Sequence, residues 1–278
     1  MKRKVDEESD IDVSSTDESD QEVDQGEEET VDVDFDFFNL NPDVDFHATK
    51  MLLRQLFGDD GSMFDVSGLA DVILVKDAIG TTIKTDGKES DPFAMISVID
   101  AQQSQPCVKQ VMDYLVEKTQ KHTEFNMFLR KLLAKDSKKR VAWIFSERLI
   151  NMPVEVTPPL YKMLLEEMAE HDLKFDYFVI VSKIYYVVAA QIPDENKSKK
   201  QKAQIIENET DYFHYEDMVL EKHAKYNIYS DYTNHKQETD SRRVFSEHGI
   251  DPKLSVMLLD AASLENAVPE MAEQFPPF

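Results

Sequence analysis

Asp211, His214 and His223 are of residue types that bind metal ions, and they lie close together in the sequence. Carboxylate oxygens and imidazole nitrogens are common ligands of zinc. However, the chain contains neither H-E-x-x-H nor an H-x-E followed by C-x-x-C, the spacings that gather such ligands around one ion. We therefore interpret these side chains as ordinary surface or boundary residues, and the sequence predicts no metal site.

The candidates for a nucleophile are equally few. Cys107 is the only cysteine, so neither an intrachain disulfide framework nor a cysteine-rich zinc site can form. It follows a proline at the start of an expected helix, where a small core residue is the ordinary interpretation. The chain has no G-x-S-x-G motif, which would expose a catalytic serine on a tight turn. We expect no catalytic residue.

Glycines are too sparse to build a phosphate-binding loop. The seven glycines lie at positions 26, 58, 61, 68, 80, 87 and 249. None of them forms G-x-G-x-x-G or G-x-x-x-x-G-K-S/T, the loops whose backbone approaches a pyrophosphate closely. The sequence therefore predicts no nucleotide cofactor, and no other cofactor either.

The strongest signal is electrostatic. The first 45 residues hold 18 acidic and three basic residues, so they carry −15 of the formal charge of −24. Large apolar side chains are scarce there, and we expect residues 1–30 to be a disordered acidic arm. Such an arm repels nucleic acid and membranes and attracts basic proteins. The alternative is a solubilising tail that has no partner.

The arm supplies the candidate partner-binding and modification residues. We expect the acidic side chains of its second half to contact a basic partner: Asp17, Glu18, Asp20, Glu22, Asp24, Glu27, Glu28 and Glu29. Four serines have carboxylates close downstream, which favours acid-directed phosphorylation: Ser9, Ser14, Ser15 and Ser19. A phosphate group at these positions would deepen the negative field of the arm.

Two short basic runs, Lys135–Arg140 and Lys197–Lys202, could contact phosphates or an import receptor. Both lie in an excess of acidic residues and lack the interleaved aromatic side chains on which bases stack. We interpret them as solvated loops and expect no direct binding of nucleic acid. No apolar stretch is long enough to span a bilayer, and no apolar run follows Lys2-Arg3-Lys4 as a signal peptide requires. We expect no membrane partner and a reducing intracellular compartment.

Residues 31–278 are expected to form a single α/β domain with a mixed central sheet flanked by helices and a mobile charged loop at 193–203. Alternating apolar and acidic residues predict an edge strand at 31–39, and Asp86-Gly87 predicts a hairpin between strands at 81–85 and 93–101. A central strand is predicted at 141–145, and further strands at 226–232 and 254–259. The run 175–190 is longer than an ordinary strand, so we expect it to bend near Ser182 and Lys183.

Helices are predicted from their apolar spacing and their start signals. Expected helices are one that ends at Gly58, one over 66–76, one that begins at Pro106, one after 215 and a closing one over 261–275. Thr123-Glu124 and Thr157-Pro158-Pro159 predict two more helices, each with a threonine as its N-cap. Trp143, Phe145, Leu160 and Leu164 are predicted core residues, and Arg148 is expected to pair with an internal carboxylate.

The segment Arg140-Val-Ala-Trp-Ile-Phe-Ser-Glu-Arg-Leu-Ile-Asn-Met-Pro153, continued by Pro158–Glu167, resembles the BCCIP family. The acidic N-terminal tract, Asp65–Asp71, the Lys/Ser-rich stretch 195–202 and Tyr212–Tyr215 fit the same family. The resemblance extends over residues 35–270 and indicates a fungal member. It implies a fold similar to the GCN5-related N-acetyltransferases without their activity, and the R/Q-x-x-G-x-G/A turn with which those enzymes bind coenzyme is missing here.

The resemblance also implies partners. Family members are nuclear, and fungal ones escort a basic ribosomal protein of the large subunit and assist the nuclear export of a phosphatidylinositol-phosphate kinase. We therefore expect a non-catalytic acidic chaperone in the nucleus, shuttling to the cytoplasm in nuclear export and ribosome biogenesis. The alternatives are a catalytically active acyltransferase and a nuclear export adaptor for the lipid kinase.

Overall fold

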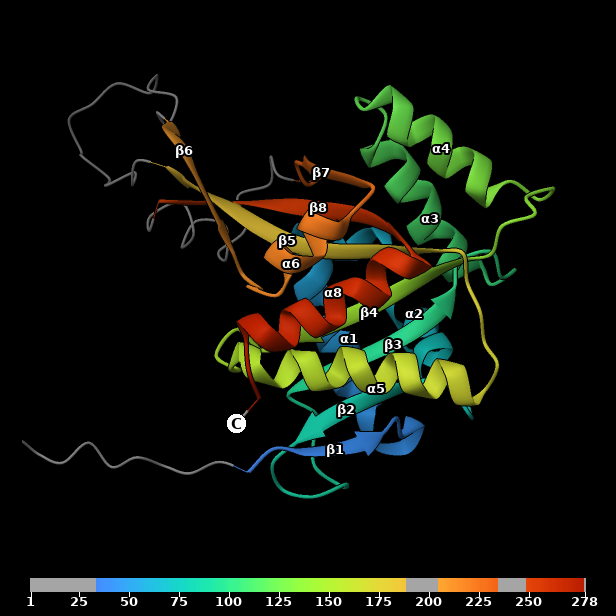
Figure 1. Cartoon of the computed structure of the whole chain (residues 1–278), viewed down its shortest axis with the longest axis vertical. Coiled ribbons are helices and arrows are strands. Elements are labelled where there is room, and N and C mark those ends of the chain that lie inside the picture. Colours follow the sequence, from blue (N-terminus) through green and yellow to red (C-terminus); the bar gives the residue numbers. More distant parts are fainter. Residues whose placement is uncertain (1–33, 189–204, 235–248, 278) are drawn as a thin grey trace, which may run out of the picture. The chain divides into compact units, whose positions relative to one another are not determined.

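The computed structural model describes residues 34–188, 205–234 and 249–277. In this part of the chain, eight strands form one mixed sheet (Figure 1). The strands are β1 (Asp36–Asn39), β2 (Gly80–Lys84), β3 (Ala94–Asp100), β4 (Val141–Arg148), β5 (Tyr177–Val188), β6 (Ile205–Tyr212), β7 (Tyr226–Ser230) and β8 (Ile250–Asp260). Their order is β1-β2-β3-β4-β5-β8-β7, and β6 pairs with β5 outside this path. Only β4 and β5 run parallel, which confirms the predicted mixed sheet with a large antiparallel share.

Helices cover both faces of the sheet. Those on one face are α1 (Pro42–Phe57), α2 (Val66–Ile73), α3 (Pro106–Lys118) and α4 (Thr123–Leu133). Those on the other face are α5 (Thr157–Glu170), α6 (Asp217–His223) and α8 (Ala261–Gln274). Short 3₁₀ helices at Gly58–Met63 and Val154–Val156 precede α2 and α5. In Figure 1, α5 and α8 lie in front of the sheet and α1 and α2 behind it.

Alternating side chains of the central strands separate two cores. On β4, Trp143 and Phe145 face α1–α4, whereas Ile144 faces α5 and α8. This period of two is what a strand buried on both faces requires. Trp143, Phe145, Leu160 and Leu164 are all buried, as predicted.

Most of the predicted helices and strands are present, although their first and last residues differ from the predicted ones. β1 lies at an edge of the sheet and α1 ends against Gly58, as expected. The β2–β3 hairpin is confirmed, but its connection spans residues 85–93 rather than a two-residue turn. Gly87 adopts a positive φ of 78° within that connection, which suits glycine.

Two local predictions are wrong. The N-caps of α4 and α5 are His122 and Val156, neither of which makes a side-chain capping bond, so the threonines that follow them are not caps. Strand β5 continues through Ser182 and Lys183, where a bend was expected, and no bulge interrupts its pairing with β8 over 177–187. The register shift lies instead in the β6 pairing, between Tyr186 and Val188. Strand β6 was not predicted.

A buried carboxylate fixes the segment that follows β7. Asp60 has no exposed surface, accepts bonds from the Tyr114 hydroxyl at 2.7 Å and from the backbone N–H groups of Thr233 and Asn234 at 2.7 and 2.8 Å, and pairs with Lys118 at 3.3 Å. Burial raises the pKa of Asp60, but these bonds and the charge of Lys118 outweigh burial and lower it. The segment therefore depends on an ionised Asp60.

The predicted mobile loop at 193–203 lies outside the described residues. No helix of the described ranges is both long enough and apolar enough to cross a membrane. The described residues, all from Asp34 onward, belong to one compact unit.

Candidate functional site

The most unusual feature of the described chain is a group of buried charges where β4 and β5 part. The two strands pair only over Val141–Ile144 and Tyr177–Ile180. Beyond that point the same edge of β5 is occupied by β6, from Ile184 onward. The end of β4, the middle of β5 and the turn between β6 and α6 meet here, and they bring six ionisable side chains together: Glu147, Arg148, Lys183, His214, Glu216 and Asp217.

Glu147 is the centre of this cluster. Its Oε1 atom lies 2.7 Å from Nε2 of His214 and accepts bonds from Nζ of Lys183 at 3.0 Å and from Nε2 of Gln55 at 2.7 Å. Burial raises the pKa of Glu147, but the positive charge of Lys183 and the contact with His214 outweigh it and lower the pKa to about 2. Glu147 is therefore ionised at neutral pH although its side chain is fully buried.

A second ion pair joins β4 to the β6–α6 turn. The guanidinium of Arg148 donates to both carboxylate oxygens of Glu216, at 2.9 and 3.3 Å, and also to the carbonyl of Met152 at 2.7 Å. This two-point geometry is the strong form of an arginine–carboxylate pair. It confirms the prediction that Arg148 has an internal carboxylate partner. The hydroxyl of Thr157 lies 3.4 Å from Glu216, which explains why that threonine does not cap α5.

Asp217 behaves in the opposite way from Glu147. Burial and then the negative charge of Glu216 raise its pKa well above the usual value, even though the Ser182 hydroxyl donates to it. No cation of the described chain pairs with this carboxyl at ion-pair distance. Asp217 therefore keeps its proton to a higher pH than an ordinary carboxyl group does.

The cluster is closed to substrates. The side chains of Lys183, His214 and Glu216 are no more than 8% exposed, and that of Glu147 is not exposed at all. Within the described ranges, Oε2 of Glu147 and Nδ1 of His214 have no hydrogen-bond partner. General acid–base chemistry needs a group within hydrogen-bond reach of a bound substrate. The bonds that these groups make are to one another and to other protein groups such as Gln55, Met152 and Ser182, and they join the β6–α6 turn to β4 and β5.

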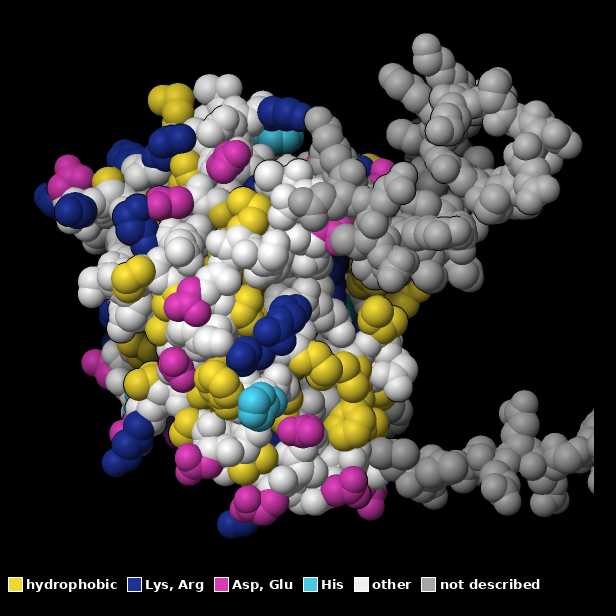
Figure 2. Space-filling view, turned by 180° about the vertical axis from the view of Figure 1, so that it is seen from behind, with side chains coloured by type: hydrophobic (Ala, Val, Ile, Leu, Met, Phe, Trp, Pro, Cys, Tyr) yellow, Lys and Arg dark blue, Asp and Glu magenta, His cyan; other side chains and the backbone are white. Residues whose placement is uncertain are grey.

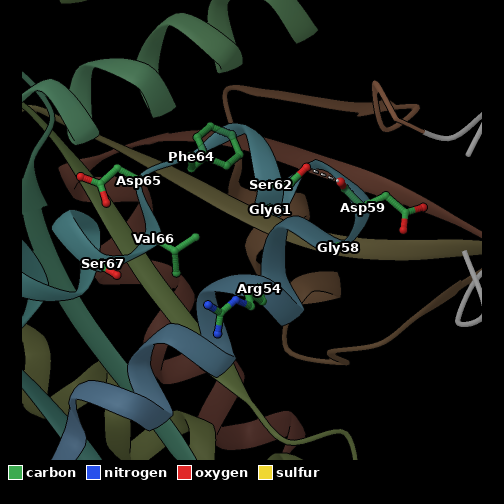
Figure 3. A pocket seen from close by; sticks show the side chains of 9 residues that line it. All are labelled: Arg54, Gly58, Asp59, Gly61, Ser62, Phe64, Asp65, Val66 and Ser67. Carbon is green, nitrogen blue, oxygen red and sulfur yellow. Dashed lines mark hydrogen bonds between the residues drawn. The ribbon is translucent and has the colours of Figure 1, made fainter.

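A surface pocket of about 590 Å³ lies between the end of α1 and the start of α2 (Figure 3). The residues lining it are Arg54, Gly58, Asp59, Gly61, Ser62, Phe64, Asp65, Val66 and Ser67. Asp65 caps α2 by accepting a bond from the N–H of Gly68 at 2.9 Å, and Ser62 bonds the backbone carbonyl of Asp59. Its lining includes serine hydroxyls but no histidine that could act as their base, so nucleophilic catalysis has no support here.

The three residues considered for a metal are held apart. Asp211 accepts a bond from the Tyr185 hydroxyl at 2.6 Å, His214 contacts Glu147, and His223 lies 2.8 Å from Glu270. Each has its own protein partner. No group of three or more possible metal ligands occurs in the part of the chain that the structure describes.

The remaining sequence candidates divide into two groups. Cys107 is buried on α3 and its pKa is raised by burial, which agrees with a core residue. In the basic loop, Lys139 pairs with Asp176 and Arg140 with Asp100 at the surface. Outside the described residues lie Lys197–Lys202, the acidic candidates between Asp17 and Glu29, and the four serines between Ser9 and Ser19.

Sequence reasoning missed the buried cluster, although two signals for it were present. Lys183 interrupts an otherwise apolar and aromatic strand, and Glu147 with Arg148 directly follows the buried run of β4. Charged residues next to buried strands are rare unless they are paired. The partners themselves, His214 and Glu216, could not be identified because they lie more than sixty residues away from β4 in the sequence.

Comparisons of the sequence and the structure with known proteins indicate one family. A sequence model of the BCCIP family matches residues 30–220. The protein BCP1 of Debaryomyces hansenii is 56% identical over 91% of this chain and 90% of its own. The bcp1 protein of Schizosaccharomyces pombe is 36% identical over 87% of this chain and 90% of its own. A crystal structure of BCP1 from Saccharomyces cerevisiae superposes with a TM-score of 0.63 at 37% identity, covering 91% of this chain and 93% of that one.

Proposed function

The chain belongs to the BCCIP family, and from this premise we propose that it is a non-catalytic, acidic escort of a basic ribosomal protein of the large subunit. The observation that carries the proposal is the concentration of acidic residues, 18 of them in the first 45 positions. A dense negative charge neutralises the lysines and arginines with which a ribosomal protein otherwise binds RNA.

Transfer of the client follows from the same electrostatics. Ribosomal RNA carries a denser array of negative charges than the arm does, so it displaces the arm when the client arrives at the assembling subunit. Phosphorylation of Ser9, Ser14, Ser15 and Ser19 would strengthen the grip before transfer. The protein itself would bind neither nucleic acid nor membranes, because its net charge repels both.

The proposal includes a place of action. We propose that the protein works in the nucleus, shuttles to the cytoplasm and takes part in nuclear export and ribosome biogenesis. A phosphatidylinositol-phosphate kinase is a second proposed export client. Support for these roles comes from family membership alone.

We also propose kinship of the fold with the GCN5-related N-acetyltransferases, without their reaction. Family membership and a mixed sheet with helices on both faces support the kinship. The missing coenzyme turn and the closed cluster around Glu147 speak against catalysis. Titration calorimetry with acetyl-CoA distinguishes this from an active acyltransferase: we expect no heat of binding, and a saturable signal would overturn the non-catalytic assignment.

Affinity purification from nuclei tests the main proposal. The full-length protein, purified at low ionic strength and analysed by quantitative mass spectrometry, should carry one basic large-subunit ribosomal protein in stoichiometric amount. Recovery without any basic companion, together with turnover of a small molecule, would refute it. The same spectra report whether the four serines carry phosphate.

A further inference from the structure

We propose that the basic client docks on the face of the sheet covered by α5, α6 and α8, with Tyr215 and Met218 as apolar anchors. This inference rests on the proposed function, because it assigns the surface of the folded domain that binds the same client. Three observations lead to it: the distribution of charge between the two helical layers, the exposure of two large apolar side chains, and the buried bonds that fix them.

The two helical layers differ in charge. Leaving out the buried Asp45 and Asp217, helices α5, α6 and α8 together carry seven acidic and two basic residues, whereas α1–α4 carry five acidic and six basic ones. Exposed acids on the first layer include Glu166 and Glu170 on α5 and Glu265 and Glu273 on α8. Figure 2 shows the opposite layer, where side chains of both signs are interspersed. A basic protein surface is therefore attracted to the α5–α6–α8 face more strongly than to the other.

Large apolar side chains lie exposed beside this charge. Tyr215 and Met218, in the turn before α6 and in its first turn, are 47% and 44% exposed. A third, Ile150, is 58% exposed and lies in the loop after β4, two residues beyond Arg148, which bonds Glu216. Tyrosine and methionine are enriched at the centres of protein interfaces. Apolar anchors on a face whose helices carry an excess of acidic residues fit a basic protein that offers apolar side chains among its lysines and arginines.

The buried cluster explains why these anchors are presented outward. Along the turn, His214, Glu216 and Asp217 point inward and bond Glu147, Arg148 and Ser182, so the residues between and after them face outward. A turn fixed by such bonds loses little conformational freedom when a partner binds. This preorganisation gives the buried charges a role in binding although none of them touches solvent.

The basic side chains at the end of α6 are already paired with an acidic residue of α8, so the acidic residues available to a client lie elsewhere on this face. Lys222 and His223 both contact Glu270 on α8. Glu273, one turn further along α8, is exposed and makes no ion pair among those found in the described chain. Glu273 can therefore accept an incoming cation, and we assign the end of α8 to the acidic part of the docking surface.

Two pairs of variants test the surface, using full-length protein and the purified client identified in the nuclear purification. Tyr215→Ala with Met218→Ala removes the anchors, and Met63→Ala with Met127→Ala is the matched control, since those methionines are 43% and 67% exposed on the α1–α4 side. We expect the first pair to raise Kd about 30-fold or more, as loss of anchor residues does, and the control to change it less than about threefold.

Charge is tested with the net change held constant. Glu265→Lys with Glu273→Lys reverses two charges on α8, and Asp71→Lys with Glu117→Lys reverses two exposed ones on α2 and α3. Because both double variants change the net charge by the same amount, a difference between their effects on Kd shows which face the client contacts. We expect the α8 pair to weaken binding about tenfold more than its control at low salt.

The outcomes separate the two proposals. Equal effects of the two faces, with unchanged thermal unfolding, would overturn the docking surface and leave the escort function standing. A wild-type protein that binds no basic ribosomal protein would overturn both. Binding of the client that depends on Tyr215 but not on salt or on the α8 acids would show that charge does not direct docking to this face, and would also refute the assignment.

Discussion

The ammonium group of Lys183 lies 3.0 Å from the carboxylate of Glu147, and both side chains are buried between β4 and β5. Removing two charges from water costs several kcal/mol per ion, and this cost is offset only when the geometry and the surrounding hydrogen bonds are good. Gln55 and His214 supply those additional bonds. The pair therefore favours the observed arrangement of β4 and β5, because any arrangement that separates Lys183 from Glu147 leaves a buried charge without its partner.

Glu147→Gln should lower the free energy of unfolding by about 3–5 kcal/mol, because it leaves Lys183 buried without its counter-charge. Urea denaturation at neutral pH measures the loss. Glu265→Gln, an exposed change on α8, is the control and should stay within about 0.5 kcal/mol.

The same variant reports the pKa of Glu147. A carboxyl whose pKa is lower in the folded state stabilises the fold above its unfolded pKa, and this stabilisation disappears as pH falls. For Glu147 the window runs from about 4.5 down to about 2. The gap between wild type and variant should shrink across that window, and a constant gap would contradict the lowered pKa.

Asp217→Asn should flatten the decline of stability at rising pH. The raised pKa means that folded protein keeps a proton that unfolded protein releases, so wild-type stability falls as pH rises above about 4. The variant has no proton to release. Denaturation series at about pH 4 and about pH 8 compare the two, with Asp71→Asn as the exposed control. Parallel pH profiles of wild type and Asp217→Asn would show that Asp217 is ionised in the fold.

Asp60→Asn should release the segment after β7 without unfolding the sheet. It removes the charge paired with Lys118 and puts an amide where two backbone N–H groups and a hydroxyl donate. Such a change costs about 2–4 kcal/mol locally. Hydrogen exchange of the Thr233 and Asn234 amides should accelerate, while exchange in β4 is unchanged. Uniform acceleration throughout the domain would argue for a global role instead.

Gly80→Ala should be poorly tolerated. A Cβ there would lie 2.3 Å from the carbonyl oxygen of Ile96 and 2.9 Å from Cα of Ser97, which are backbone atoms of the neighbouring strand. Gly87→Ala is the informative control, since φ is positive but nothing lies within 4 Å, and it should cost only about 1 kcal/mol. Thermal unfolding compares the loss of stability in the two variants. An equal loss would mean that the backbone of β3 shifts to make room for the extra methyl group.

Deleting residues 1–30 should slow association with the client and flatten its salt dependence, because it removes a formal charge of −10 out of −24 and leaves the folded domain in place. Stopped-flow measurement between low and physiological salt reports both effects. An unchanged on-rate at low salt would refute the role of the arm.

Periodicity was sufficient to predict most of the fold, because strands and helices around a core repeat their apolar side chains every two or 3.6 residues. This placed β4, α5 and β8 and identified Trp143 as core. Strand β6 escaped because its sequence, Ile-Ile-Glu-Asn-Glu-Thr-Asp-Tyr, is mostly polar and forms through pairing with β5.

The buried cluster could not be predicted for a related reason. Local sequence signals assume local partners, and they assigned Thr157 to a helix cap. In the structure its hydroxyl lies near Glu216, 59 residues away. Likewise, the charge of Lys183 within an apolar run indicated a bend when only its neighbours in the sequence were considered. In the structure Lys183 lies within β5, and its ammonium group bonds Glu147, which lies on β4 and is distant in the sequence.

The strand order has a consequence for synthesis on the ribosome. β1 to β4 pair in the order in which they emerge, so this half can assemble while the remainder is still being made. Until α5 has crossed over and β5 arrives, the outer edge of β4 presents unpaired backbone groups beside Trp143 and Phe145. The nascent chain thus passes through an aggregation-prone intermediate. A stalled or truncated product ending near residue 170 would keep this exposed edge and would be a target for chaperones and proteases.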